Sequence, residues 1–387
     1  MPATIATERP HDVAEVAVRA RSDPGAVEVL LLAGLAMLLT GTVVEALFGF
    51  WARAATAGDN QRYLAIVNGI LHWDFTGVSV MHLWGLPYAV AAVSAISGVT
   101  SLHALVAISV TASLLSVWLA QRLWGGWVAA YFAVVSFDWL MRSTLGGPEP
   151  LFVALLFGAF VSARRERWAL AALFAALATT VRLLAIFALA AIALELLRLR
   201  RYRQLLAAML VAGAIGAAYV LPMWATFGNP LANAAGYRGD WLGASPVTFP
   251  FVAIAQSFLR EGWHARELLP SIFWLAVAAA AILAAIRNRG FREYVRTHPV
   301  ESVTAGLYLL FVFSYNSVYA RTDFPRFLVP ILPVCLLAVH PWLPKRRALL
   351  WAGGAVWGVL AGAAATHGAW YAITYMVYLL RSAVRLN

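Results

Sequence analysis

One long apolar run follows another through this chain, and that succession limits its possible folds more than any other feature. Hydrophobic residues make up 62% of the 387 positions and charged residues only 12%, whereas a soluble domain has about 25% charged residues. Backbone polar groups in lipid must bond within their own segment, so helices are the expected spanning elements. We therefore predict an all-α, polytopic transmembrane bundle of about eleven spans of ~20 residues each.

The spans fall into a single membrane domain, 27–387, after a polar tail at 1–26. The predicted spans are 27–50, 101–120, 126–143, 150–163, 168–181, 183–197, 204–226, 269–286, 300–317, 327–343 and 348–366. The tail lacks the short apolar stretch and cleavage site of a signal peptide, so the first span is expected to remain as an anchor. Eleven spans leave the C-terminus outside, and a short twelfth span over 370–380 would return it to the inner side.

Basic residues separate between alternate loops, which predicts the orientation of the bundle in the membrane. One set of loops holds fifteen basic residues, namely Arg122, Arg164, Arg165, Arg167, Arg198, Arg200, Arg201, Arg203, Arg287, Arg289, Arg292, Arg296, Lys345, Arg346 and Arg347. The other, longer set holds nine, namely Arg53, Arg62, Arg142, Arg182, Arg238, Arg260, Arg266, Arg321 and Arg326. The first set is expected to face the cytoplasm of a cell (inner) membrane. Because these residues lie mostly at the ends of apolar runs, the net charge of +11 indicates contact with membrane lipids and not with nucleic acid.

Two long loops are predicted on the outer side, 51–100 and 227–268. In the first, Gly58 breaks the chain, and Asp59 begins a segment whose apolar residues recur at helical spacing up to Leu71. This pattern predicts an amphipathic helix lying in the membrane interface. A second apolar run, 87–98, is too short to span and is expected to form another interfacial helix. A loop as long as the second one is often functional.

Polar residues that can do chemistry gather on this predicted outer side. The candidate catalytic residues are Asp59 and Glu149. The candidate substrate-binding residues are Tyr63, Asp74, His82, Arg182, Tyr315, Arg321 and Arg326. Structural explanations exist for several of them. An interfacial Asp commonly caps a helix, a Glu beside Pro is commonly a turn residue, and an outer Arg commonly reaches the lipid headgroups. Arg321 and Arg326 can also pair with Asp323.

Taken together, these residues favour one class of reaction. Arginines suit a phosphate because their donors match its oxygens. A carboxylate suits removal of a proton from an attacking hydroxyl. Lipid-facing helices suit an isoprenoid tail. The pattern therefore predicts transfer from a lipid-linked phosphate donor at the membrane surface.

The order of five segments resembles the GT-C superfamily, the polytopic glycosyltransferases that use polyprenyl-phosphate sugars. The nearest branch includes the protein O-mannosyltransferase-like, aminoarabinose-transferase-like and PIG-V-like enzymes. The segments that carry the resemblance are GDNQRYLAIVNGIL (58–71), HLWGLPYAVAAVSAISGV (82–99), RSTLGGPEPLFVALLFGAF (142–160), RRERWALAALFAALATTVRLLAIFALAAI (164–192) and PRFLVPILPV (325–334).

The resemblance implies a role for each matching residue. Asp59 would be the general base that activates the acceptor hydroxyl and gives inversion at the sugar carbon. Glu149 would hold the acceptor or a metal, Arg182 and Arg326 would contact the donor phosphate, and Tyr63 would support the site. The implied partners are a polyprenyl-phosphate sugar donor and a lipid, glycan or protein acceptor.

The chain departs from the family pattern beside the proposed base. The family often has a second acidic residue near the first Asp, whereas here the neighbours are Asn60 and Gln61, and the nearest acid is Asp74. This departure leaves a divalent metal an open question. His72 and His82, ten positions apart, form no tight metal motif.

Two other classes of function stay open. A transporter or flippase for a lipid-linked or anionic substrate would need polar residues at the bilayer midplane and two related halves. The main acids inside predicted spans, Glu45 and Glu195, lie near span ends, and no related halves are evident. A membrane scaffold without enzymatic activity would leave the outer arginines unexplained.

Overall fold

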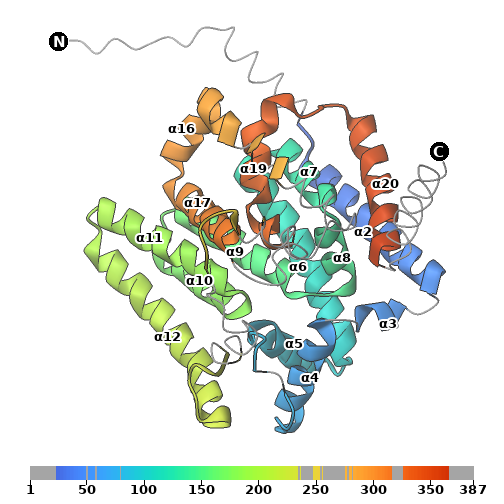
Figure 1. The fold of residues 1–387 in the computed structure, drawn as a ribbon, viewed down its shortest axis with the longest axis vertical. Helices are drawn as coiled ribbons and strands as arrows, with labels where there is room; N and C mark the ends of the chain where they lie inside the picture. Colours follow the sequence, from blue (N-terminus) through green and yellow to red (C-terminus); the bar gives the residue numbers. More distant parts are fainter. Residues whose placement is uncertain are drawn as a thin grey trace.

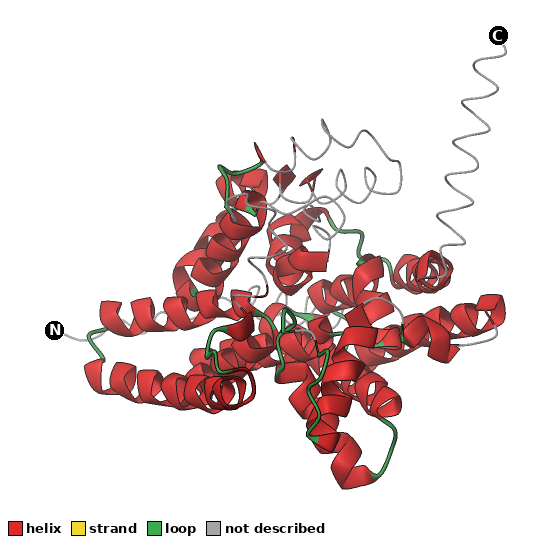
Figure 2. Cartoon of the chain, turned by 60° about the horizontal axis from the view of Figure 1, so that its bottom comes forward, coloured by secondary structure: helices red, strands yellow, loops and turns green. Residues whose placement is uncertain are grey.

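The computed structural model describes residues 23–48, 51–56, 59–78, 80–233, 236, 247–252, 255, 275–276, 279–280, 282–315 and 326–365. Within these ranges the chain is helical, with one isolated bridge between Val247 and Tyr315 and no β-strand (Figure 2). The predicted all-α class is confirmed for this part of the chain. The tail 1–22, most of the loop 227–268 and the possible twelfth span lie outside the described residues.

The helices are α2 (Ala26–Phe48), α3 (Trp51–Ala55), α4 (Asp59–His72), α5 (Gly85–Ser97), α6 (Ser101–Trp124), α7 (Gly126–Val135), α8 (Phe137–Leu145), α9 (Pro148–Arg164), α10 (Trp168–Val181), η1 (Leu183–Ala185), α11 (Ile186–Arg198), α12 (Tyr202–Phe227), α16 (Arg289–Thr297), α17 (Pro299–Ser314), η2 (Val329–Ile331), α19 (Leu332–Val339), η3 (His340–Trp342) and α20 (Arg347–Ala365). The two helices predicted within the first outer loop are present as α4 and α5.

Four of the described helices, α2, α6, α12 and α20, are long and apolar enough to cross a membrane, and the bent pair α8–α9 makes up to five. Several apolar helices of 10–17 residues accompany them. The length and apolar composition of these helices indicate a membrane protein. One predicted span was wrong in detail, because 126–143 is not one helix. It divides at Ser136, whose side chain accepts a hydrogen bond from the Trp139 N–H and caps α8.

Small residues bring α20 against α2, and the two helices lie side by side in Figure 1. Gly358 and Gly362 leave no room for a side chain, since a Cβ there would lie 2.6 Å and 2.7 Å from the carbonyl oxygens of Ala36 and Thr40. The Thr40 hydroxyl donates to the Gly358 carbonyl at 3.0 Å. This spacing of small residues four apart is the usual way in which helix backbones approach closely in membranes.

A sharp bend between α8 and α9 shapes the centre of the molecule. The two helices meet at 104°, and Gly146 at the bend has a φ of +94°, in the left-handed region that favours glycine. The bend lies against the first turn of α4. The Asn60 amide donates to the carbonyls of Leu145 and Gly146, both at 3.1 Å, which fixes α4 against the bend.

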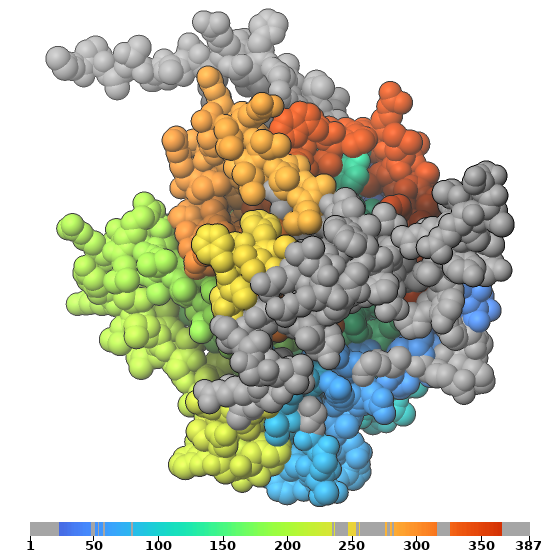
Figure 3. Space-filling view, in the orientation of Figure 1, coloured from blue at the N-terminus to red at the C-terminus, as the bar shows by residue number. Residues whose placement is uncertain are grey.

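On another side, α4 and α5 lie beside the end of α12, as the blue and yellow-green surfaces in Figure 3 show. The Trp84 N–H donates to the Tyr219 hydroxyl at 3.1 Å, and the Trp84 and Phe227 rings meet edge to face at 5.5 Å. Trp84 is almost fully buried. This aromatic contact ties the first loop to the main bundle and thereby positions α4.

Candidate functional site

Two carboxylates and two arginines from four separate segments meet at the bend. Asp59 is the first residue of α4, and Glu149 lies in the first turn of α9. Arg182 follows the last residue of α10 in an extended conformation, and Arg326 begins the segment that leads into η2. With His82, which lies just before α5, we call this set the two-carboxylate cluster.

Arg326 joins the two carboxylates. Its Nη2 donates to Asp59 Oδ2 at 2.9 Å, and its Nε donates to Glu149 Oε1 at 2.6 Å. Arg182 Nη2 donates to the same Glu149 oxygen. Both guanidinium groups also lie over the Phe327 ring, 5.7 Å and 5.9 Å from its centroid. The ring therefore fixes the two arginines side by side.

Burial differs sharply among these side chains. Glu149 is 3% exposed, Arg326 11% and Arg182 18%, whereas Asp59 is 29% exposed. Asp59 is thus the acid that a molecule arriving from outside the protein would meet first, with Glu149 behind it.

His82 and Tyr63 complete the surroundings of Asp59. The His82 Nε2 lies 3.5 Å from Asp59 Oδ1, and the Tyr63 ring meets the His82 ring edge to face at 5.1 Å. Tyr63 is one turn after Asp59 on α4 and is buried. Burial raises the pKa of its hydroxyl, so Tyr63 stays protonated and can act only as a neutral group.

The pKa of Asp59 is held well below its usual range. The hydrogen bond from His82 is the largest cause, and the charges of Arg326 and Arg142 add to it against burial, which acts in the opposite direction. Asp59 is therefore ionised at neutral pH and bound to His82 and Arg326. It is a weak base for as long as these contacts persist.

A third guanidinium group acts on the cluster. Arg142, in the last turn of α8, acts on both carboxylates together with Arg326, and Arg182 acts on Glu149. In addition, the second oxygen of Glu149, Oε2, is buried without a hydrogen-bond partner among the described residues. The guanidinium groups suit an anion, and a hydroxyl could satisfy the free oxygen.

The remaining predicted site residues lie apart from this cluster or outside the described chain. Asp74 is exposed in the loop after α4, where its Oδ1 accepts the Thr76 N–H at 3.0 Å, and this bond lowers its pKa. Tyr315 follows the last residue of α17, and its ring meets the Phe327 ring edge to face at 5.7 Å, so it touches the ring that supports the arginines. Arg321 lies outside the described residues.

Two further residues that act on the cluster were not selected from the sequence. Arg142 was counted only as an outer basic residue, although its place one turn before the Gly146–Gly147 pair was a usable signal. Tyr308 of α17 is fully buried and interacts electrostatically with Arg182 and Glu149. It lies inside an apolar run, and nothing in that run distinguishes it from an ordinary core residue.

The donor set around the bend does not fit a divalent metal ion. Across the part of the chain that the structure describes, no three His, Cys, Asp or Glu side chains gather as metal ligands. Asp59 and Glu149 are both paired with guanidinium groups, which a cation would have to displace against like charge. We therefore derive no step through a metal.

Any assignment of a function to this chain rests on the site alone, because comparisons with known proteins found no match. No protein-family model matches the chain, and neither curated proteins nor solved structures gave a significant match.

Proposed function

We propose that the protein is an inverting glycosyltransferase with a GT-C-like bundle of about eleven spans. It moves a sugar from a polyprenyl-phosphate donor to an acceptor at the outer face of the cell membrane. The observation that carries the proposal is the bridge made by Arg326 between a partly exposed Asp59 and a buried Glu149, with Arg182 on the same Glu149 oxygen. An acid beside two or three arginines suits deprotonation next to a bound phosphate.

The reaction proceeds by one displacement. The acceptor hydroxyl attacks the anomeric carbon of the sugar while Asp59 takes its proton. The bond between that carbon and the phosphate oxygen breaks, and the electron pair leaves with the polyprenyl phosphate. Arg182 and Arg326 stabilise the negative charge that builds up on the leaving group.

Donor binding also prepares the base. In the free protein Arg326 is shared between the two carboxylates, and the pKa of Asp59 is low. A phosphate that draws Arg326 toward itself removes one of the causes of that low pKa. The basicity of Asp59 then rises when the donor is in place, which limits proton transfer to the loaded enzyme.

One observation favours a second candidate, a transporter or flippase of a lipid-linked or anionic substrate. A helix pair broken at 104° with a buried ion pair at the break resembles the discontinuous helices of transporters. The two functions differ in their products. Only the glycosyltransferase breaks a covalent bond, whereas only the transporter moves an unaltered substrate between leaflets.

The test uses the full chain, purified into lipid nanodiscs. Lipids that accompany the protein are identified by mass spectrometry, and the matching polyprenyl-phosphate sugar is then supplied with membrane extract as acceptor. The proposal expects a co-purified polyprenyl-phosphate sugar and release of free polyprenyl phosphate on incubation. Intact donor that crosses liposome membranes without release of polyprenyl phosphate would support the transporter instead.

A further inference from the structure

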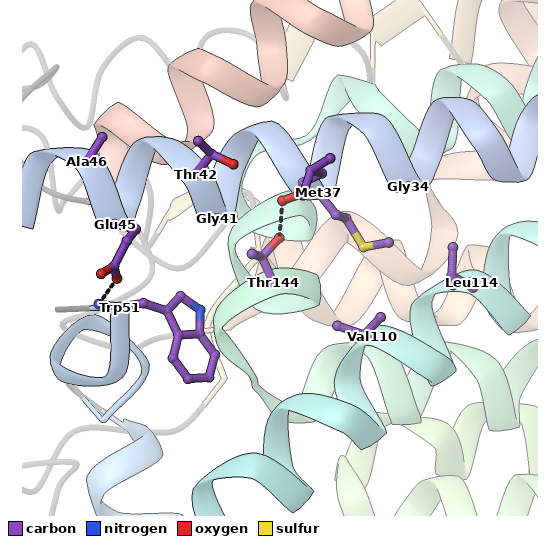
Figure 4. A pocket seen from close by; sticks show the side chains of 11 residues that line it. Gly34, Met37, Gly41, Thr42, Glu45, Ala46, Trp51, Val110, Leu114 and Thr144 are labelled. Carbon is purple, nitrogen blue, oxygen red and sulfur yellow. Dashed lines mark hydrogen bonds between the residues drawn. The ribbon is translucent and has the colours of Figure 1, made fainter. Parts of the chain in front are cut away.

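An apolar groove runs along α2 (Figure 4), and no residue of the two-carboxylate cluster is among the described residues that line it. Its volume is about 710 Å³, and it is open along one side. The groove is lined by Gly34, Met37, Leu38, Gly41, Thr42, Glu45, Ala46, Trp51, Val110, Leu114 and Thr144. These residues come from α2, α3, α6 and α8, and α2 and α6 are both long enough to cross a membrane. Leu38, which lines the groove, is 67% exposed, so the open side presents an apolar surface that suits hydrocarbon.

The length of the groove matches one leaflet of a bilayer. From Gly34 to Ala46 α2 rises roughly 18 Å, at 1.5 Å per residue. One half of the hydrocarbon core measures roughly 15 Å. The groove therefore has the length of a single lipid chain in the outer leaflet, with Glu45 and Trp51 at the level of the headgroups.

The polar end of the groove selects the type of headgroup. Among the described residues that line the groove, Glu45 is the only charged one, and its Oε2 accepts the Trp51 backbone N–H at 2.7 Å. A carboxylate repels a phosphate, whereas its remaining lone pairs accept hydrogen bonds from hydroxyl groups. The cationic residues that suit the donor phosphate, Arg182 and Arg326, belong to the cluster and do not line the groove.

The groove and the cluster share a wall. The Thr144 hydroxyl donates to the Met37 carbonyl at 3.4 Å on the groove side. One and two residues later, the carbonyls of Leu145 and Gly146 accept hydrogen bonds from the side chain of Asn60, the residue after Asp59. At the polar end of the groove, Val44, Ala55 and Leu145 pack together with Trp51, and the Asn60 side chain also donates to the Ala55 carbonyl at 2.9 Å. A lipid whose headgroup lies at Glu45 and Trp51 therefore has it beside the first turn of α4.

We propose that this groove binds the acyl chain of the acceptor, a membrane lipid whose headgroup carries a free hydroxyl and no phosphate. This assignment rests on the proposed glycosyltransferase function, because it narrows the acceptor from lipid, glycan or protein to lipid. It also gives the two lipids separate positions, with the phosphate of the donor at the arginines and the chain of the acceptor along α2.

Position 34 allows the groove to be filled without disturbing the fold, since a Cβ on Gly34 would meet nothing within 4 Å. Gly213 on α12 is a matched control, because its Cβ also meets nothing within 4 Å and it is exposed outside the groove. The probe is a diacylglycerol with a photoreactive diazirine in one acyl chain, in phosphatidylcholine nanodiscs. The comparison probe is phosphatidic acid with the same chain.

The expected result is labelling of α2 and α6 peptides by the diacylglycerol, several-fold stronger than by the phosphatidic acid. Gly34→Phe should lower this labelling several-fold, and Gly213→Phe should leave it unchanged. Glu45→Gln, which keeps an acceptor for the Trp51 N–H, should abolish the preference for the diacylglycerol. Equal labelling by both probes in the wild type, or labelling that Gly34→Phe does not lower, would overturn the proposal. A dimer that Gly34→Phe dissociates, together with an absence of lipid labelling, would also overturn the proposal, because a second copy of the chain would then occupy the groove.

Donor binding is measured separately with polyprenyl phosphate, which keeps the two proposals distinguishable. Donor binding without groove labelling overturns the acceptor assignment alone. Groove labelling without donor binding supports a lipid site on α2 and overturns the glycosyltransferase function.

Discussion

The two ends of helix α9 each hold a buried carboxylate paired with arginine, yet the two arrangements differ in almost every other respect. At the first turn lies Glu149 with Arg182 and Arg326, and at the last turn Arg164 binds Glu301 of α17. About 22 Å of helix separates Glu149 from Arg164. The same helix therefore offers an internal comparison between two kinds of ion pair.

At the last turn of α9, both oxygens of the Glu301 carboxylate accept hydrogen bonds. Arg164 donates to both oxygens of Glu301, at 2.6 Å and 2.9 Å. Tyr294 donates to Glu301 as well, and its own hydroxyl accepts the Trp124 Nε1–H at 2.6 Å. Burial and the adjacent carboxylate raise the pKa of Tyr294, which keeps its hydroxyl protonated as a donor. No buried side-chain nitrogen or oxygen of these four residues lacks a hydrogen-bond partner, as expected of a purely structural contact.

At the first turn of α9, by contrast, the carboxylates of the cluster are incompletely paired among the described residues. One oxygen of Glu149 lacks a partner among the described residues, Arg326 is divided between two acids, and Asp59 is partly exposed. Among the described residues, three guanidinium groups act on these two acids, whereas the Glu301 network pairs one acid with one arginine. A buried ionic group that is neither fully paired nor fully enclosed is costly, and such groups are concentrated at functional sites. Because of this difference in pairing, we assign the chemistry to the first turn of α9 and a stabilising role to its last turn.

The largest expected effect separates the two ends by activity. Asp59→Asn keeps the size of the side chain but removes the base, so transfer should fall about 10²–10⁴-fold. Glu301→Gln should leave the activity of each folded molecule unchanged. Sugar transfer in nanodiscs, normalised to folded protein, measures both. An Asp59→Asn variant with full activity would contradict the role of base.

Stability should change in the opposite order. Glu301→Gln removes the charge from a buried carboxylate that accepts hydrogen bonds from both Arg164 and Tyr294, so the free energy of unfolding should fall by about 2 kcal/mol. Asp59→Asn should cost much less, because Asp59 is partly exposed and Arg326 keeps Glu149 as a partner. Thermal unfolding in detergent compares the two variants. Equal losses would remove the distinction between a structural and a functional end.

A smaller effect is expected from the shape of the cation. Arg326→Lys retains the charge but cannot contact two carboxylates and a phosphate with one planar group. The KM for the donor should rise about tenfold, equivalent to about 1.4 kcal/mol. Arg167→Lys, on the loop between α9 and α10, is a control with the same chemical change and no expected effect. An unchanged KM in Arg326→Lys would argue against phosphate binding at this residue.

The smallest effect concerns pH. Because the folded pKa of Asp59 lies below its ordinary value of 3.8, its ion pair is fully present above about pH 4 and is lost only as the pH falls further. The kcat/KM profile of the wild type should show no acid limb from Asp59 between pH 5 and 8, with both limits taken roughly. His82→Phe keeps an aromatic ring against Tyr63 but removes the largest cause of the low pKa, so its acid limb should move to higher pH. His72→Phe, at an exposed position on α4, should not move it.

Much of the site could be predicted from the sequence, but not its geometry. Asp59, Glu149, Arg182 and Arg326 were selected separately, as polar residues on one predicted side of a membrane. That argument gives a side and a depth, but not a distance within the plane of the bilayer. The contact between positions 59 and 326 spans 267 residues, and only packing brings them together.

The fold shows the same limit. Hydropathy predicted helices and long apolar segments, and α2, α6 and α12 agree with them. Hydropathy could not reveal the break at Ser136, because one small residue barely changes the average of an apolar run. The approach of α20 to α2 depends on Gly354, Gly358 and Gly362. Their spacing was visible in the sequence, but it does not identify the partner helix.

The central claim is that one end of α9 binds a lipid phosphate and the other does not. The most direct test measures polyprenyl phosphate bound to the wild type, Arg326→Gln and Arg164→Gln in nanodiscs, by native mass spectrometry. The account predicts that Arg326→Gln loses bound polyprenyl phosphate, while folded Arg164→Gln retains it despite lower stability. Undiminished binding in Arg326→Gln, or equal loss in both variants, would contradict the claim.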